Sequence, residues 1–404
     1  MGIKKLLTFF LVWRILLFIF LFFALYYLPL QKNFLGGGLE NYLEKPYLWA
    51  WANFDGEHFL AIAKEGYRPL TYFFFPVYPI LTRLFAGLIG GSFYSYLVSG
   101  LFLSHSAFFI GLMGLVRLIR LDYKGNIVFL TIILVLLFPT SFYFASVYSE
   151  SLFLALSVWT FYFARKKRWV LVGLLGAIAS ATRIVGVALF PALVVEALIQ
   201  AKEKKTHLFL PIVSSFCVLL GLITYATFLR QDAGDPLAFF NSLNQVFGEQ
   251  RSQILIFLPQ VFYRYIFKIL PNINYSYFPV VFSTWFEFLV AVLFGGLGLL
   301  GILALRLHHI SYGMWLRSGS SRIFELAKIR SSYTVYLVLG YLIPTLTGSF
   351  SSLPRYVLIL FPGFILMAVY LNKLKSSYRY FFFAILFILL GIATALFVRG
   401  YWIA

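Results

Sequence analysis

Long apolar segments recur along almost the whole chain, with little polar sequence between them. A helix needs about 17 to 25 mainly apolar residues to cross a bilayer, and distorted segments cross with fewer. In lipid the backbone must satisfy its own hydrogen bonds, so such segments fold as helices. The sequence therefore predicts an all-α fold, a polytopic transmembrane bundle of about 11 spans. The expected spans are 7–30, 96–118, 126–146, 150–165, 169–182, 184–199, 207–229, 280–306, 332–348, 357–371 and 380–398.

The composition agrees with a membrane protein and argues against a nucleic-acid-binding protein. Charged residues make up 12% of the chain, whereas soluble domains carry about 25%. The net charge of +19 is not concentrated in a polar domain that could dock a duplex. We assign it to cytoplasmic loops that set the membrane orientation, with anionic lipids as counter-charge.

The basic residues predict an orientation. With Lys4 and Lys5 in the cytoplasm, most of the 33 basic residues fall in cytoplasmic loops, as the positive-inside rule requires. The segment 73–90 is apolar, but Pro76 and Pro79 break its start, so we expect a dipping or surface helix. The expected domain is a single unit, 1–404, with a helical first outer loop at 31–72 and a second long outer loop at 230–279.

Asp55 lies in the first of these outer loops, inside the segment WANFDGEHF at 51–59. If 50–65 is helical, Asp55, His58 and Phe59 share one face. A carboxylate among aromatic side chains is partly desolvated, which suits it to general-base chemistry. The alternative is that Asp55 only caps a surface helix.

Three further charged residues stand in apolar surroundings near the expected outer face: Glu150, Arg183 and Arg355. Charges at membrane depth are costly, so they tend to be paired or functional. Glu150 could instead stabilise a helix N-terminus. Arg183 could clamp a phosphate or pair with an acid such as Glu150 or Glu287. Arg355 could be an ordinary snorkelling residue.

The sequence offers no metal site and no nucleotide-binding loop. His308 and His309 are adjacent, His105 and His207 are isolated, and no histidine or cysteine cluster has metal-ligand spacing. No glycine-rich loop stands between a strand and a helix. We expect no metal and no cofactor.

Four blocks, in the same order, resemble the mannosyltransferase family of PIG-V, which adds a mannose during assembly of GPI anchors. They span roughly 50–362. The first contains DGEHF at 55–59, IAKEGY at 62–67 and FFPVYP at 74–79; the second contains FPTSF at 138–142 and YSESLF at 148–153. The third is TRIVG at 182–186, and the fourth is PRY at 354–356 with Phe361 and Pro362.

The resemblance implies a membrane glycosyltransferase of GT-C type, a class that typically uses polyprenyl-phosphate sugars and inverts the anomeric centre. Asp55 matches the family's acidic residue and would be the general base. Phe54 departs from the pattern, which often has Trp beside the acid. The expected reaction moves a hexose, with mannose as the expected sugar, to a lipid-linked or glycan acceptor on the non-cytoplasmic face. The residues expected to bind substrate are Trp51, Glu57, His58, Tyr67, Glu150, Arg183, Arg355 and Tyr356.

Two other functions remain open at this point. A lipid or glycolipid transporter or flippase would also place charges inside a bundle, although no broken-helix pair recurs in repeated positions. A non-catalytic scaffold would not need the cluster of charges. The catalytic hypothesis requires that Asp55, Arg183 and Arg355 meet in an apolar pocket.

Overall fold

The computed structural model describes residues 1–204, 207–241, 254–311 and 329–403, and within these ranges every regular element is a helix. The predicted all-α class is therefore confirmed. The longer helices are α1 (Ile3–Tyr27), α6 (Phe93–Ile119), α8 (Glu150–Arg165), α10 (Leu189–Lys204), α11 (Phe209–Asp232), α15 (Phe278–Ser311), α17 (Ser331–Thr345) and α20 (Ser376–Val398). The shorter ones are α2 (Gly38–Glu44), α3 (Pro46–Trp49), α4 (Asp55–Glu65), α5 (Val77–Leu88), α7 (Asn126–Leu137), α9 (Trp169–Ser180), α12 (Ala238–Asn241), α14 (Leu258–Arg264), α18 (Leu353–Tyr356) and α19 (Phe361–Asn372).

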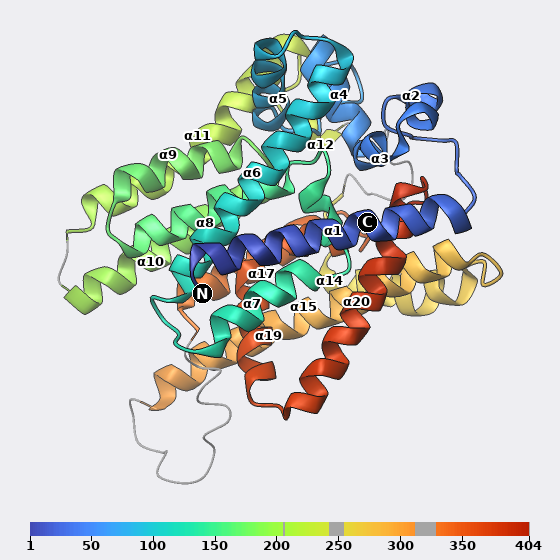
Figure 1. Ribbon diagram of the computed structural model, residues 1–404. Helices are drawn as coiled ribbons and strands as arrows, with labels where there is room; N and C mark the ends of the chain where they lie inside the picture. Colours follow the sequence, from blue (N-terminus) through green and yellow to red (C-terminus); the bar gives the residue numbers. More distant parts are fainter. Residues whose placement is uncertain (205–206, 242–253, 312–328, 404) are drawn as a thin grey trace.

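Six helices of the described residues are long and apolar enough to cross a membrane: α1, α6, Ile184–Glu203, α11, α15 and α20. The bent pair Leu353–Ile359 and Phe361–Asn372, which turns by 83°, brings the number to seven if it is counted as one span, compared with the prediction of about 11. The protein is thus a multi-pass membrane protein. In Figure 1, α6, α8, α9, α10 and α11 form one group, while α7, α15, α19 and α20 lie on the other side of α1.

Of the remaining expected spans, 150–165 matches α8, whereas the others are shorter than predicted or broken. In place of 126–146, α7 has 12 residues and is about 18 Å long. It ends because Phe138 precedes Pro139 and takes an extended conformation, with ψ of 134°. The helices α8, α9 and α17 have 16, 12 and 15 residues. Apolar composition alone could not locate these breaks.

The segment predicted as a dipping or surface helix, 73–90, contains α5, which begins at Val77 directly after Pro76. With 12 residues it measures about 18 Å, which is shorter than the hydrocarbon core. The segment 31–72 is helical as expected, since it holds α2, α3 and α4. Of the second long segment, 230–279, residues 242–253 lie outside the described residues, and the rest contains α12 and α14.

A cluster of ion pairs, which we call the Arg165 cluster, lies at the C-terminal end of α8. Glu150 lies at the other end of this helix. Arg165, the last residue of α8, pairs with Asp122 at 2.6 Å and with Glu196 at 3.7 Å. Arg330 also binds Glu196, at 2.7 Å. Because Glu196 is fully buried, these pairs tie α10 and the start of α17 to the end of α8.

Helices α9 and α11 approach each other closely at Gly221. A Cβ atom at Gly221 would collide with the Ala177 carbonyl oxygen, the Ser180 hydroxyl and the Ala181 nitrogen. Small residues allow helix backbones to approach in this way inside a membrane.

We predict that Gly221→Ala destabilises the bundle by about 1–3 kcal/mol, because the methyl group must push two backbones apart. Gly296→Ala is the matched control, since a Cβ atom there meets nothing within 4 Å. Thermal unfolding of the purified full chain should show a lower midpoint for Gly221→Ala only. Equal midpoints for the two variants would mean that the α9–α11 contact is looser than described.

Candidate active site

Asp55 is the first residue of α4 and follows a tightly held turn. Phe54 has a φ of +56°, an unusual conformation for a residue with a side chain, so its surroundings must hold it. Asn53 provides part of that hold: its Nδ2 donates to the Phe397 carbonyl at 3.0 Å, and its Oδ1 accepts from the Gly36 amide at 3.0 Å. The Tyr148 hydroxyl donates to the Asn53 carbonyl at 2.8 Å. Three segments, around Gly36, Tyr148 and Phe397, thus fix the position of Asp55.

Two carboxylates and two guanidinium groups meet beside this turn, and we call Asp55, Glu150, Arg183 and Arg355 the charged tetrad. Arg355 Nη1 lies 2.5 Å from Asp55 Oδ2, and Arg183 Nη1 lies 2.6 Å from Glu150 Oε1. Arg355 Nε is 3.4 Å from the same Glu150 oxygen. Glu150 therefore joins the two pairs. Asp55, Arg183 and Arg355 therefore lie together, as predicted, and their roles stay predictions.

The breaks between helices supply these four residues. Glu150 begins α8, and Arg355 lies in the single turn of α18, just before the bend. Arg183 has an extended backbone, with φ of −157° and ψ of 144°, between α9 and the next helical turn. A side chain at such a break can point into the bundle from a helix end.

The charged tetrad is nearly closed to solvent. The exposed fractions are 8% for Asp55, 1% for Glu150 and 4% for Arg355. Tyr356 lies under both guanidinium groups, with ring centroids 5.2 Å from Arg183 and 5.3 Å from Arg355. Among the described residues, Glu150 Oε2 and Arg355 Nε have no hydrogen-bond partner. The formal charges cancel, but polar atoms remain that a ligand could satisfy.

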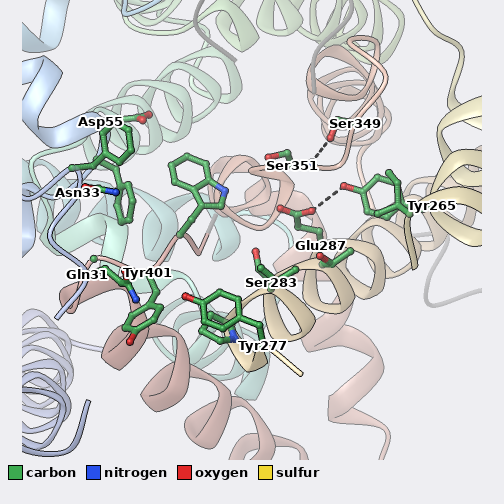
Figure 2. A pocket seen from close by; sticks show the side chains of 18 of the residues that line it. Gln31, Asn33, Asp55, Tyr265, Tyr277, Ser283, Glu287, Ser349, Ser351 and Tyr401 are labelled. Atoms are coloured by element: carbon green, nitrogen blue, oxygen red, sulfur yellow. Dashed lines mark hydrogen bonds between the residues drawn. The ribbon is translucent and has the colours of Figure 1, made fainter. Parts of the chain in front are cut away.

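Two cavities meet at Asp55. The narrow cavity, about 350 Å³, contains Asp55 and the other three residues of the tetrad in its lining, together with Tyr356 and aromatic residues such as Phe73, Phe74 and Phe75. The larger cavity, about 900 Å³, is lined by Asp55, His58 and many hydroxyl, amide and aromatic side chains (Figure 2). Asp55 is the charged residue that lines both.

Three predicted substrate contacts line neither of these cavities. Trp51 is fully buried; its Nε1 donates to the Tyr47 carbonyl, and the Arg14 guanidinium lies 4.3 Å from its ring. Tyr67 donates to the Phe74 carbonyl at 2.7 Å. Glu57 lies on α4 away from both cavities, and burial raises its pKa, opposed by the charge of His58. Trp51 and Tyr67 thus make packing and hydrogen-bond contacts within the fold, and their expected contact with substrate stays a prediction.

The sequence reasoning missed several lining residues of the larger cavity: Tyr265, Tyr277, Glu287, Tyr401 and Trp402. For Glu287 a signal existed, because it is an acid inside the apolar stretch 280–306. The sequence suggested Glu287 only as a partner of Arg183, but in the structure Arg183 pairs with Glu150. The aromatic residues gave no signal, since the chain holds 48 Phe, 27 Tyr and 8 Trp.

Among the described residues, no group of three or more His, Cys, Asp or Glu side chains could hold a metal ion. The charged groups of the site are the Asp55 carboxylate, which is open to both cavities, and Glu150, Arg183 and Arg355 beside it.

Fold and site together define a multi-pass membrane protein with a buried charged centre between two cavities. A sequence model of the family described as "Mannosyltransferase (PIG-V)" matches residues 3–266, so the chain belongs to this family of mannosyltransferases. It is accordingly a glycosyltransferase with a mannose donor and an acceptor. No curated protein and no solved structure matches the chain. The match includes Asp55, Glu150 and Arg183, while Arg355 lies beyond it.

We predict that Glu150→Gln lowers the free energy of unfolding by about 3 kcal/mol, because two buried guanidinium groups lose their shared carboxylate. Glu44→Gln is the control, since the Glu44 side chain is 66% exposed and its pair with Lys45 contributes little. Thermal unfolding of both variants tests this. Equal stability of the two would show that Glu150 does not hold the arginines.

Proposed function

We propose that this protein transfers mannose from a polyprenyl-phosphate donor to a hydroxyl of a lipid-linked or glycan acceptor, with Asp55 as general base. The observation that carries the proposal is the position of Asp55, which lines both cavities and pairs with Arg355. A group transfer needs two substrates to meet at the reacting atoms, and the junction of two cavities provides such a place.

The narrow cavity suits the donor. Its wall of phenylalanine side chains, including Phe239 and Phe240, can take a hydrocarbon tail, and Arg183 with Arg355 lies in the same lining. Guanidinium groups bind phosphate oxygens well in a partly desolvated site. Since the tetrad is formally neutral without substrate, a phosphate adds negative charge beside two cations and two carboxylates. It competes with Asp55 for Arg355, which frees the carboxylate for catalysis.

The reaction then balances as follows. Asp55 accepts the proton of the acceptor hydroxyl while the hydroxyl oxygen attacks the anomeric carbon. The bond from that carbon to the phosphate oxygen breaks, and its electron pair leaves with the phosphate. Arg183 and Arg355 stabilise the charge that develops on this leaving group. Attack opposite the leaving group inverts the anomeric centre, and Glu150 keeps both arginines in place.

We further propose that the N-terminus is cytoplasmic and that the site opens on the non-cytoplasmic face. The support is the excess of Lys and Arg in the loops expected inside. The charged tetrad and the Arg165 cluster also lie at opposite ends of α8.

The orientation can be tested by cysteine labelling, because Cys217 is the chain's one cysteine. In a Cys217→Ser background, Asn33→Cys should react with a membrane-impermeant maleimide in intact cells. Lys4→Cys should react only after the membrane is opened. The reverse pattern would place the site in the cytoplasm.

We predict that Asp55→Asn lowers kcat by about 10² to 10⁴, the usual contribution of a general base, and leaves donor binding intact. The assay incubates purified protein with polyprenyl-phosphate mannose and a lipid extract, and follows the added hexose by mass. Glu40→Gln, an exposed acid of the same loop, should turn over like the wild type. Full turnover by Asp55→Asn would assign the base elsewhere, and a transporter would form no new covalent product in either form.

A further inference from the structure

The larger cavity differs in chemistry from the narrow one. Its lining includes the hydroxyl and amide side chains Gln31, Asn33, Ser283, Thr284, Ser349 and Ser351. Such groups donate and accept hydrogen bonds, so a cavity lined by them suits a polar ligand better than a lipid tail. At about 900 Å³, the cavity is near the upper end of ordinary ligand sites. Its occupant is therefore sizeable and polar.

Aromatic rings accompany these polar groups. Tyr277, Tyr401 and Trp402 line the same cavity, and Figure 2 shows Tyr277 and Tyr401 close together beneath it. An aromatic face offers apolar surface, and the Tyr and Trp polar atoms offer hydrogen bonds at the ring edge. A sugar ring presents C–H groups on its faces and hydroxyl groups around its rim. The mixture of aromatic faces and hydroxyl partners matches that pattern.

Glu287 lines another wall of the larger cavity, where a hydrogen bond fixes its carboxylate. Tyr265 donates its hydroxyl to Glu287 Oε2 at 2.9 Å and accepts from the Phe350 amide at 3.2 Å. Glu287 is 6% exposed and lines the cavity. A fixed carboxylate accepts hydrogen bonds from two neighbouring hydroxyl groups, and it disfavours an anionic group at the same place.

The C-terminal residues connect the aromatic wall of the cavity, which contains Tyr401 and Trp402, to Asp55. Trp402 packs edge-on against Phe54, with centroids 5.1 Å apart, and Phe54 directly precedes Asp55. The Tyr401 amide donates to the Leu396 carbonyl at 3.0 Å, and the Tyr143 hydroxyl donates to the Ile403 carbonyl. The wall is thus anchored before ligand binds, which lowers the entropy cost of binding.

From these observations we infer that the larger cavity binds a neutral, hydroxyl-rich sugar of the acceptor, with Trp402 and Tyr277 against the ring and Glu287 on its hydroxyl groups. The inference rests on the proposed mannosyl transfer, for which it names the acceptor class. It makes Trp402 and Glu287 specificity-determining residues. These residues lie outside 3–266, the part of the chain that the family match covers.

Direct binding tests the inference without turnover. The full chain in lipid nanodiscs, with polyprenyl phosphate saturating the donor site, is mixed with methyl α-mannoside, methyl β-glucoside or acyclic mannitol. Saturation-transfer NMR should show contact with the ring protons of both glycosides and little with mannitol. Trp402→Ala should weaken glycoside binding at least tenfold, Glu287→Gln several-fold, and Trp402→Phe less than Trp402→Ala.

Trp285→Ala is the matched control, because Trp285 is a partly exposed tryptophan of α15 that does not line the cavity. In the transfer assay, Trp402→Ala should raise the acceptor KM at least tenfold and leave the donor KM unchanged. The inference is overturned if the wild type binds no glycoside, or if Trp402→Ala binds as well as Trp285→Ala.

The two proposals fail separately. Glycoside binding that depends on Trp402, in a protein that transfers no mannose, would refute the transfer reaction and leave the sugar site standing. Transfer that depends on Asp55, in a protein whose larger cavity binds no glycoside, would refute only the sugar site.

Discussion

The ion pair between Asp55 and Arg355 joins residues 300 positions apart in sequence, and the rest of the site is arranged around it. Separating the pair would leave an unpaired charge in a region that is almost closed to water, at a cost of several kcal/mol. Glu150 extends the pair to Arg183. The result is a formally neutral network that keeps α4, α8 and α18 together and places a carboxylate open to both cavities beside two guanidinium groups.

This network depends on breaks between helices. A continuous transmembrane helix satisfies its own backbone and directs its side chains outward along its length. Here Arg183 has an extended backbone after α9, and Arg355 lies just before an 83° bend. Irregular backbone at membrane depth is tolerated where protein surrounds it or a cavity opens beside it. The breaks at Arg183 and beside Arg355 thus allow these two side chains to enter the site.

Much of this could be predicted from the sequence. Asp55, Glu150, Arg183 and Arg355 stand out because charge inside apolar sequence is rare and costly, and the structure brings all four together. The helical class followed from the same apolar runs. The break inside the expected span 126–146 did not follow, since Pro139 interrupts a segment whose composition stays apolar. The break at Arg183 was expected, between the spans 169–182 and 184–199.

The aromatic residues were the least predictable. Trp51 stood beside Asp55 in sequence, yet its ring packs between α1 and its own turn, next to Phe18 and Arg14. Trp402, almost at the end of the chain, reaches the cavity because the turn after α20 is bonded to the segment that follows α1, through Gln31 and Arg399. One aromatic residue among so many carries no local signal, and only the fold decides which of them face a cavity.

The most direct measurement is an experimental density map of the full chain with polyprenyl phosphate bound. The account predicts the phosphate within hydrogen-bonding distance of both Arg183 and Arg355, the tail along Phe73, Phe74 and Phe75, and the Asp55 carboxylate turned toward the larger cavity. A phosphate bound at the Arg165 and Arg330 cluster, or in the larger cavity, would contradict it.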